Sequence, residues 1–187
     1  MLNFEQFVVI VHETVISSAS SIIAIFFVVL LITGSFKLGL LVIFSVLLVD
    51  LILIAMVPLW DLTFNNIVVV HLVASLGLSV LYSVHMALSF HLAEAPRDMP
   101  KPKQRLWKAR VGLSRIGSSV LHGSIATLLA VTIVGIFAQR SYFFIVFFKL
   151  WLGIVLIGMA NAFILIPILL SFLGPTPDYE KKRNERR

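Results

Sequence analysis

The stretch GLLVIFSVLLVDLILIAMVPL, residues 39–59, decides the fold class, because it runs for about 20 residues with a single charge, Asp50. A run of this length and composition crosses the hydrocarbon core of a bilayer as an α-helix. Comparable runs lie on either side of it. We place five spans at about 15–33, 39–59, 67–90, 116–138 and 150–173. The sequence therefore predicts an all-α, polytopic transmembrane helix bundle.

The composition excludes most soluble functions. Hydrophobic residues make up 59% of the 187 residues, and the mean hydropathy is +1.04, far from an ordinary globular domain. Five spans leave no room for a soluble catalytic domain, and there is no Ser/His/Asp arrangement, phosphate loop or HExxH motif. We therefore expect no enzyme activity, no cofactor and no metal site. Because the net charge of +6 is explained by membrane topology, we expect no nucleic-acid partner either.

Three segments flank the spans. Residues 1–14 alternate apolar and polar side chains at helical spacing, which predicts an amphipathic helix that lies in the membrane interface and leads into the first span. Residues 103–115 are predicted to form a surface helix with Leu106, Trp107 and Val111 directed toward lipid. Residues 174–187 form a basic tail. The whole five-span domain thus extends from residue 15 to residue 173.

The positive charges indicate the orientation of the bundle. Threading five spans places the loop 34–38, the loop 91–115 and the tail on one face, and only Arg140 and Lys149 of the 15 Lys and Arg residues fall on the other face. Short basic loops stay in the cytoplasm. We therefore expect a cytoplasmic C-terminus and a lumenal or extracellular N-terminus, with endomembrane and plasma membrane equally open.

Asp50 is the most informative polar residue within the spans. A charge at the centre of the bilayer costs about 2.5–3.5 kcal/mol on the lenient insertion scale, so this side chain must face the bundle or carry a proton. Two interpretations stay open. Asp50 is either a neutral carboxylic acid that bonds a neighbouring helix or a site for protons or ions; intramembrane acids favour the second.

The third predicted span carries a polar stripe on one broad helical face. Its members are His71, Ser75, Ser79, Tyr82, His85 and Ser89. Serines and the nearby Gly77 are typical of close helix packing, whereas histidines can relay protons near neutral pH. Helix packing and a proton relay are therefore equally supported, and the stripe is expected to face other helices.

Depth along the spans predicts which groups meet Asp50. Taking residues 49 and 79 as the centres of the second and third spans, Ser79 and Tyr82 lie nearest. His71 is about 12 Å toward the lumen and His85 about 9 Å toward the cytoplasm. We also assign His122 and Asn161 to helix packing or to a secondary polar site, with a carbonyl-bonded structural role favoured for His122.

Several short stretches together resemble the Niemann–Pick type C/Patched family of sterol and lipid transporters, within the resistance–nodulation–division superfamily. The stretches are FEQF (4–7), LVD (48–50), LW (59–60), GLSV (77–80) with His85, GSSV (117–120), FFK (147–149), GMAN (158–161) and LIPILLSFLGP (165–175). They cover nearly the whole chain in order. The resemblance implies the last five spans of a protein with about twelve or thirteen, and the Niemann–Pick branch looks closer.

Two departures qualify what the resemblance implies. In the family an acidic residue associated with cation coupling follows the glycine by four positions, where this chain has Leu81, and an asparagine six positions before the glycine is replaced by His71. The acidic relay therefore does not carry over directly, and Asp50 takes its place as the candidate. Compared with the family's half-unit, the chain also lacks a first span, the lumenal domain and the N-terminal half.

These observations lead to three alternative functions. The first is a C-terminal fragment of a sterol or lipid transporter, not competent alone, that contributes one wall of a transmembrane sterol path. The second is a non-transporting membrane scaffold or partner-binding subunit. The third is half of a proton-driven export permease. The expected partners are membrane lipids, among them a sterol, and either the missing N-terminal half or another membrane subunit.

Overall fold

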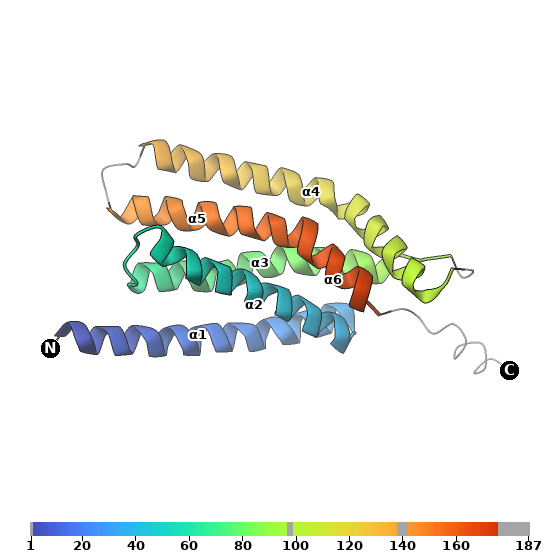
Figure 1. Cartoon of the computed structure of the whole chain (residues 1–187), viewed down its shortest axis with the longest axis horizontal. Coiled ribbons are helices and arrows are strands. Elements are labelled where there is room, and N and C mark those ends of the chain that lie inside the picture. The colour runs from blue at the N-terminus through green and yellow to red at the C-terminus, as the bar shows by residue number, and fades with distance from the viewer. Residues whose placement is uncertain (1, 97–98, 138–141, 176–187) are drawn as a thin grey trace.

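The computed structural model describes residues 2–96, 99–137 and 142–175, with side chains from residue 12 onward. The described residues form α1 (Leu2–Thr33), α2 (Phe36–Leu59), α3 (Asn66–Leu92), α4 (Lys101–Phe137), α5 (Tyr142–Ala160), the π-helical turn η1 (Asn161–Leu165) and α6 (Ile166–Leu173). The elements α5, η1 and α6 follow one another as one long rod (Figure 1). Five helices are long and apolar enough to cross a membrane, which confirms the predicted all-α bundle of five spans.

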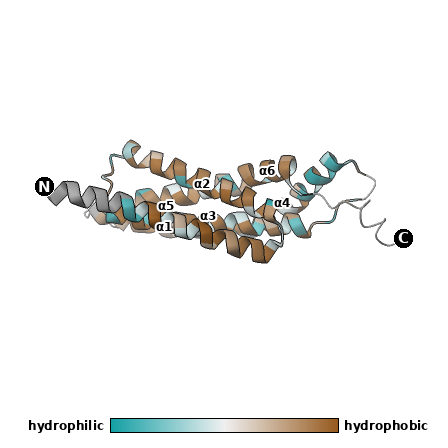
Figure 2. Cartoon of the chain, turned by 90° about the horizontal axis from the view of Figure 1, so that it is seen from below, coloured by the Kyte–Doolittle hydropathy of each residue, from teal (hydrophilic) through white to brown (hydrophobic). Residues whose placement is uncertain are grey.

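Successive helices run in opposite directions along one common axis (Figure 1). The helix α3 contacts α1, α2, α4 and α5, so it forms the centre of the bundle. The helix α1 packs against α2 and α3 at one edge. The turn 34–35, residues 93–96 after α3 and Gly174 lie at the same end of the bundle, where hydrophilic residues gather at the start of α4 (Figure 2). We refer to this end, defined by Lys37, residues 101–115 and Gly174, as the basic end.

Two helices differ from the expected boundaries. The helix α1 is continuous over 32 residues, or about 48 Å, so the predicted entry segment and the first span form one helix. Because a hydrocarbon core is about 30 Å thick, the first turns of α1 extend beyond it if the helix crosses. The expected surface helix 103–115 is likewise continuous with the fourth span in α4, which changes direction near the basic end (Figure 1). The last rod begins at Tyr142, before the expected residue 150.

The turns are built from residues that tolerate unusual backbone angles. Gly34 has φ +60°, and its N–H donates to Leu30 O at 2.8 Å, which ends α1 as glycine commonly does. Asp61 has φ +53° directly after α2. Asn65 caps α3, since its side-chain oxygen accepts from Val68 N at 3.1 Å. These local signals explain why the chain reverses within a few residues.

Packing between the helices is apolar along most of their length. Leu53, Leu72 and Leu150 join α2, α3 and α5 in one cluster far from the basic end, and Phe90 and Leu170 join α3 and α6 at the basic end. All five side chains are at most 2% exposed. Lipid tails are as apolar as leucine, so close packing rather than water exclusion stabilises such contacts.

Two cationic side chains tie helix ends together. Lys149 Nζ on α5 donates to the Trp60 carbonyl beyond the end of α2 at 2.9 Å. Arg105 Nη1 on α4 donates to the Phe172 carbonyl in the last turn of α6 at 2.7 Å. The last carbonyls of a helix lack partners within the helix, and cations near them interact favourably with the helix dipole. These two bonds therefore tie the α5–η1–α6 rod to the end of α2 and to α4.

Candidate functional site

Asp50 lies inside the bundle and contacts α3. It is 7% exposed, and the Ser75 hydroxyl donates to its Oδ1 at 3.0 Å. The same hydroxyl lies 2.6 Å from the Leu72 carbonyl in its own helix. A hydroxyl carries one hydrogen, so Ser75 serves one of these two acceptors at a time. The carboxyl group can therefore gain or lose this bond while Ser75 keeps a partner.

The predicted contact of Asp50 on α3 was displaced by about one helical turn. Ser79 and Tyr82 were expected, whereas the structure pairs Asp50 with Ser75. Four residues of α3 correspond to about 6 Å along the axis, which is the error of assuming that the centres of two apolar runs lie at equal depth. The offset between α2 and α3 is set by side-chain packing, which the hydropathy pattern does not contain.

A second polar cluster lies farther along the same α2–α3 contact. Asn161 Nδ2 on η1 donates to Ser83 Oγ at 3.0 Å, Ser83 donates to the Ser79 carbonyl at 2.7 Å, and Ser45 Oγ on α2 lies 3.5 Å from Ser83 Oγ. All four residues are at most 3% exposed. Within the described part of the chain, Asn161 Oδ1 and Ser79 Oγ have no hydrogen-bond partner. Buried oxygens of this kind suit a bound water or another donor.

Sequence reasoning missed two members of this cluster. Ser83 lies four residues after Ser79 on α3 and therefore shares its inner edge, but it falls outside the arc centred on the histidines. Ser45 is one serine in an otherwise apolar run. The sequence does signal this cluster, because Ser75, Ser79 and Ser83 recur every four residues and therefore lie along one side of a helix.

His71 is buried, but it does not reach Asp50 through any bond that the structure shows. Its Nδ1 lies 2.6 Å from the Ile67 carbonyl in the same helix. Its ring packs edge-on against Phe147 of α5, with 5.4 Å between the ring centroids. The structure thus gives His71 a helix-packing environment.

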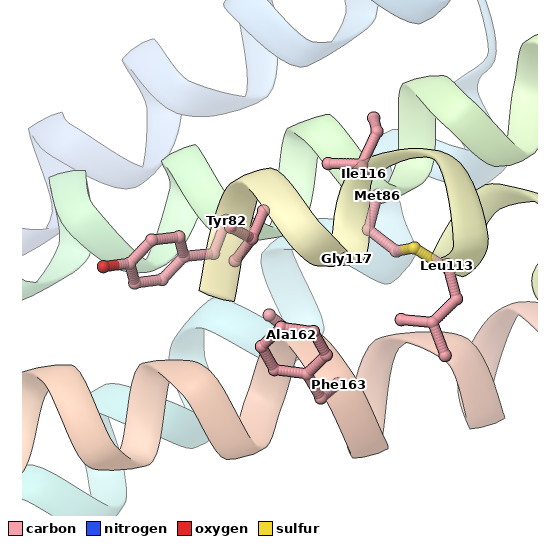
Figure 3. Close-up of a pocket in the computed structure, with 8 residues that line it drawn as sticks. Tyr82, Met86, Leu113, Ile116, Gly117, Ala162 and Phe163 are labelled. Carbon is pink, nitrogen blue, oxygen red and sulfur yellow. The ribbon is translucent and has the colours of Figure 1, made fainter. Parts of the chain in front are cut away.

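Five of the six members of the polar stripe of α3 are buried as expected, namely His71, Ser75, Ser79, Tyr82 and Ser89, and His85 is the exception. Tyr82 is buried, whereas His85 and Gly77 are exposed on the same side as Leu81. Tyr82 borders a cavity of about 10 Å³ between α3, α4 and η1, with its hydroxyl directed away from the other lining residues (Figure 3). The five buried members fall within an arc of about 80°, and His85 lies about 40° beyond its edge.

Other candidate polar residues serve helix contacts. Ser89 Oγ on α3 donates to the Gly112 carbonyl on α4 at 3.3 Å, which is the interhelical bonding expected of the stripe. His122 is exposed, and its Nδ1 lies 2.6 Å from the Ser118 carbonyl in the same helix. The structure therefore places His122 apart from Asp50. Among residues 2–96, 99–137 and 142–175, no three His, Asp or Glu side chains gather as metal ligands would.

A groove of about 210 Å³ lies between α4 and α5. Its lining is Thr127, Ala130, Val131 and Val134 from α4 with Phe147 and Trp151 from α5. The Thr127 hydroxyl is used within its own helix, where it donates to the Gly123 carbonyl at 2.9 Å. The Trp151 indole N–H is buried and lacks an acceptor among the described residues. The groove therefore offers an apolar wall, the usual lining of a site for an apolar ligand, and the buried Trp151 N–H does not reach its surface.

Comparison with known proteins yields relatives over most of the chain. The chain is 36% identical over 175 residues to "NPC intracellular cholesterol transporter 1 homolog 1b" of Drosophila melanogaster, an alignment that covers 93% of the chain and 13% of that protein. It is 32% identical over 176 residues to "NPC intracellular cholesterol transporter 1" of Sus scrofa, with 92% of the chain and 13% of that protein covered.

A third relative comes from another branch. "Protein patched homolog 1" of Caenorhabditis elegans is 33% identical over 111 residues, which is 59% of the chain and 7% of that protein. No protein-family profile matches the chain. The chain thus spans about an eighth of the length of the first two relatives, so their alignment concerns this helix bundle and not the whole of either protein.

Proposed function

Because the chain belongs to the Niemann–Pick C1/Patched family of membrane proteins, we propose that it is the C-terminal membrane portion of a sterol or lipid transporter. It supplies one wall of a transmembrane lipid path and is not competent to transport alone. The proposal is supported by the relatives' names and by the small share of those proteins that the chain spans. Transporters built from repeated halves bind substrate between the halves, and one bundle offers only one side.

The observation that carries the proposal is the groove between α4 and α5. It lies between two candidate spans, and its side chains are apolar apart from Thr127. Phe147 and Trp151 stack at a tilt of 33° with 5.6 Å between ring centroids, so they form a rigid aromatic side of the groove. The rigid apolar ring system of a sterol matches such a wall.

Photolabelling tests the groove. The chain is reconstituted in nanodiscs with a photoactivatable sterol, and the labelled peptides are identified by mass spectrometry. Ala130→Trp fills the groove and is expected to lower labelling of α4 and α5 about tenfold, equivalent to about 1.4 kcal/mol. Leu129→Trp adds the same ring one residue away, at a position that does not line the groove, and should leave labelling unchanged.

The outcome separates the sterol path from lipid contact in general. Excess cholesterol should compete with the photolabel, and excess phosphatidylcholine should not. Equal labelling of the Ala130→Trp and Leu129→Trp variants, or equal competition by both lipids, would show that the groove is ordinary lipid-exposed surface.

We also infer that Asp50 and the polar groups near it form a proton relay or polar path. The buried pair of Asp50 and Ser75 supports this role, as does the unpartnered Ser79 Oγ one turn farther along α3. Tyr82 and the two histidines, His71 and His85, remain candidates for the ends of the path. Gly77, His122 and Asn161 are assigned to helix packing or to a secondary polar site, and the buried Asn161 to Ser83 bond supports that assignment for Asn161.

A partner-binding role is the second candidate, and one observation favours it. The helix α3 is central in the bundle, yet Ala74, Gly77, Leu81 and His85 are exposed along one of its faces. Small residues on such a face allow another helix to approach closely. The partner at this face is either the missing N-terminal half or another membrane subunit. The complete assembly then transports sterol, exports another substrate with protons, or serves as a scaffold. The coding sequence upstream of Met1 distinguishes the two partners, because an in-frame set of further spans supports the N-terminal half.

We propose, finally, that the basic end faces the cytoplasm and the opposite end the lumen or the cell exterior. The charge asymmetry of the loops supports this orientation. It makes the short segment 60–65 lumenal or extracellular, and the start of α4 cytoplasmic.

A further inference from the structure

The first turns of α4 concentrate positive charge without any negative charge. Between residues 101 and 115 the chain has six cations, Lys101, Lys103, Arg105, Lys108, Arg110 and Arg115. No Asp or Glu occurs in the sequence from residue 99 to residue 177. Because no acidic neighbour on α4 neutralises these cations, their counter-ions must come from elsewhere on the protein or from outside it.

Two of these cations are used inside the bundle. Arg105 bonds the Phe172 carbonyl at 2.7 Å, and Lys108 is 5% exposed with its ammonium 5.5 Å from the centroid of the Phe90 ring. On the same inner side, Gly112 packs so closely that a Cβ there would lie 3.2 Å from Phe90 N. These contacts hold the segment rigidly against α3 and α6, so its opposite face has a fixed orientation.

That opposite face carries a second set of side chains. Lys103, Leu106, Trp107, Arg110 and Ser114 are all exposed, and at 100° per residue they fall within an arc of about 100°. Leu106 and Trp107 are 46% and 42% exposed. Lys103 and Arg110 lie about 10 Å apart along the axis, one on each side of Trp107. We call these five residues the outer stripe.

We propose that the outer stripe binds the headgroup of an anionic phospholipid. Lys103 and Arg110 contact the phosphate and carboxylate oxygens, and Trp107 and Leu106 lie at the boundary between headgroups and acyl chains. Tryptophan favours this depth, and basic clusters beside a membrane span attract anionic lipids. A soluble phosphate would match the cations but not the exposed indole and leucine, so a membrane lipid fits the whole surface. The proposal does not depend on the sterol path.

The experiment measures lipid preference next to the stripe. The chain has no cysteine, so a single Ser118→Cys substitution at an exposed position of α4, one turn beyond the outer stripe, takes one fluorescent donor. The labelled protein is placed in phosphatidylcholine nanodiscs with acceptor-labelled phosphatidylserine, which unlabelled phosphatidylserine or phosphatidylcholine then displaces. The ratio of the two competition constants gives the preference for the anionic lipid.

We expect the double variant Lys103→Gln/Arg110→Gln to reduce this preference about 25-fold, because each cation contributes about fivefold at an anionic surface. Lys181→Gln with Lys182→Gln removes the same charge from the tail and should leave the preference unchanged. Lys103→Arg with Arg110→Lys keeps both charges and should retain it. Circular dichroism checks that each variant keeps its helix content.

Three results would overturn the proposal. The first is a starting protein with no preference for phosphatidylserine. The second is a loss of less than about twofold in the Lys103→Gln/Arg110→Gln variant. The third is an equal loss in the tail variant, which would show that net charge alone, rather than the outer stripe, attracts the lipid.

Discussion

Replacing Asp50 by Asn and by Ala separates packing from proton chemistry. The Ser75 hydroxyl lies 3.0 Å from Asp50 Oδ1. The Asn variant keeps a carbonyl oxygen that can accept this hydrogen bond. Ala removes the acceptor, but Ser75 still has the Leu72 carbonyl at 2.6 Å, so no donor is left unpaired. Interhelical hydrogen bonds in membranes contribute about 0.6 kcal/mol on average and about 1.7 kcal/mol at most.

We therefore expect Asp50→Asn to change the free energy of unfolding by less than about 0.5 kcal/mol, within the average value of such a bond. Asp50→Ala should destabilise the bundle by about 1–2 kcal/mol, because the small cavity left by the carboxyl group adds to the lost bond. Reversible unfolding in mixed detergent micelles, followed by circular dichroism, measures both values. If Asp50→Asn lowers the free energy of unfolding as much as Asp50→Ala does, the bundle needs the carboxylate itself for stability, and the reasoning from this hydrogen bond fails.

The same pair of variants tests the relay. In a full-length protein that carries this bundle, Asp50→Asn removes the titratable group while keeping its shape and its bond. If Asp50 exchanges protons during transport, lipid movement measured at several pH values should lose its pH dependence in the Asn variant. An unchanged activity and pH profile would make Asp50 a structural acid.

Two further predictions concern topology and packing. Single cysteines at the exposed positions Asn66 and Lys103 should react with an impermeant thiol reagent from opposite sides of a sealed vesicle; reaction from one side would refute the proposed orientation. Gly158→Leu should destabilise the bundle by about 1–3 kcal/mol in the same unfolding assay, because even a Cβ there would lie 3.2 Å from the Tyr82 ring. Gly123→Leu, where nothing lies within 4 Å of the Cβ, should be close to neutral and is the matched control.

Hydropathy was enough to predict the fold class and the number of spans, but it does not mark where a helix begins. The fourth predicted span starts at residue 116, whereas the helix that contains it, α4, begins at Lys101. The reason is that hydropathy reports which residues suit lipid, while a helix continues wherever its backbone bonds are favourable. Lys108 and Gly112 lie in that early part, held against Phe90 by contacts that no apolar window detects.

The candidate site was predicted less completely than the fold. Asp50 was recognised because a single acid in an apolar run is conspicuous, but its partner depends on how far α2 and α3 slide past each other. Asn161 was assigned to helix packing or to a secondary polar site, and its bond to Ser83 depends on how α5 and α3 pack against each other. His85 shares a broad helical arc with buried serines, and only the packed bundle shows that it lies outside.

The irregular turn at η1 also explains a rhythm in the last rod of the bundle. Buried residues recur at spacings of three and four from Val146 through Leu150, Ile154 and Gly158 to Asn161, and Ile166 follows Asn161 by five residues. In a regular α-helix a spacing of five advances about 500°, so Ile166 would be turned about 140° from Asn161. The wider hydrogen-bonded ring at η1 takes up one extra residue, or about 100° of that rotation. The last two turns of the rod therefore direct Ile166 and Leu170 into the bundle because one turn is wound differently.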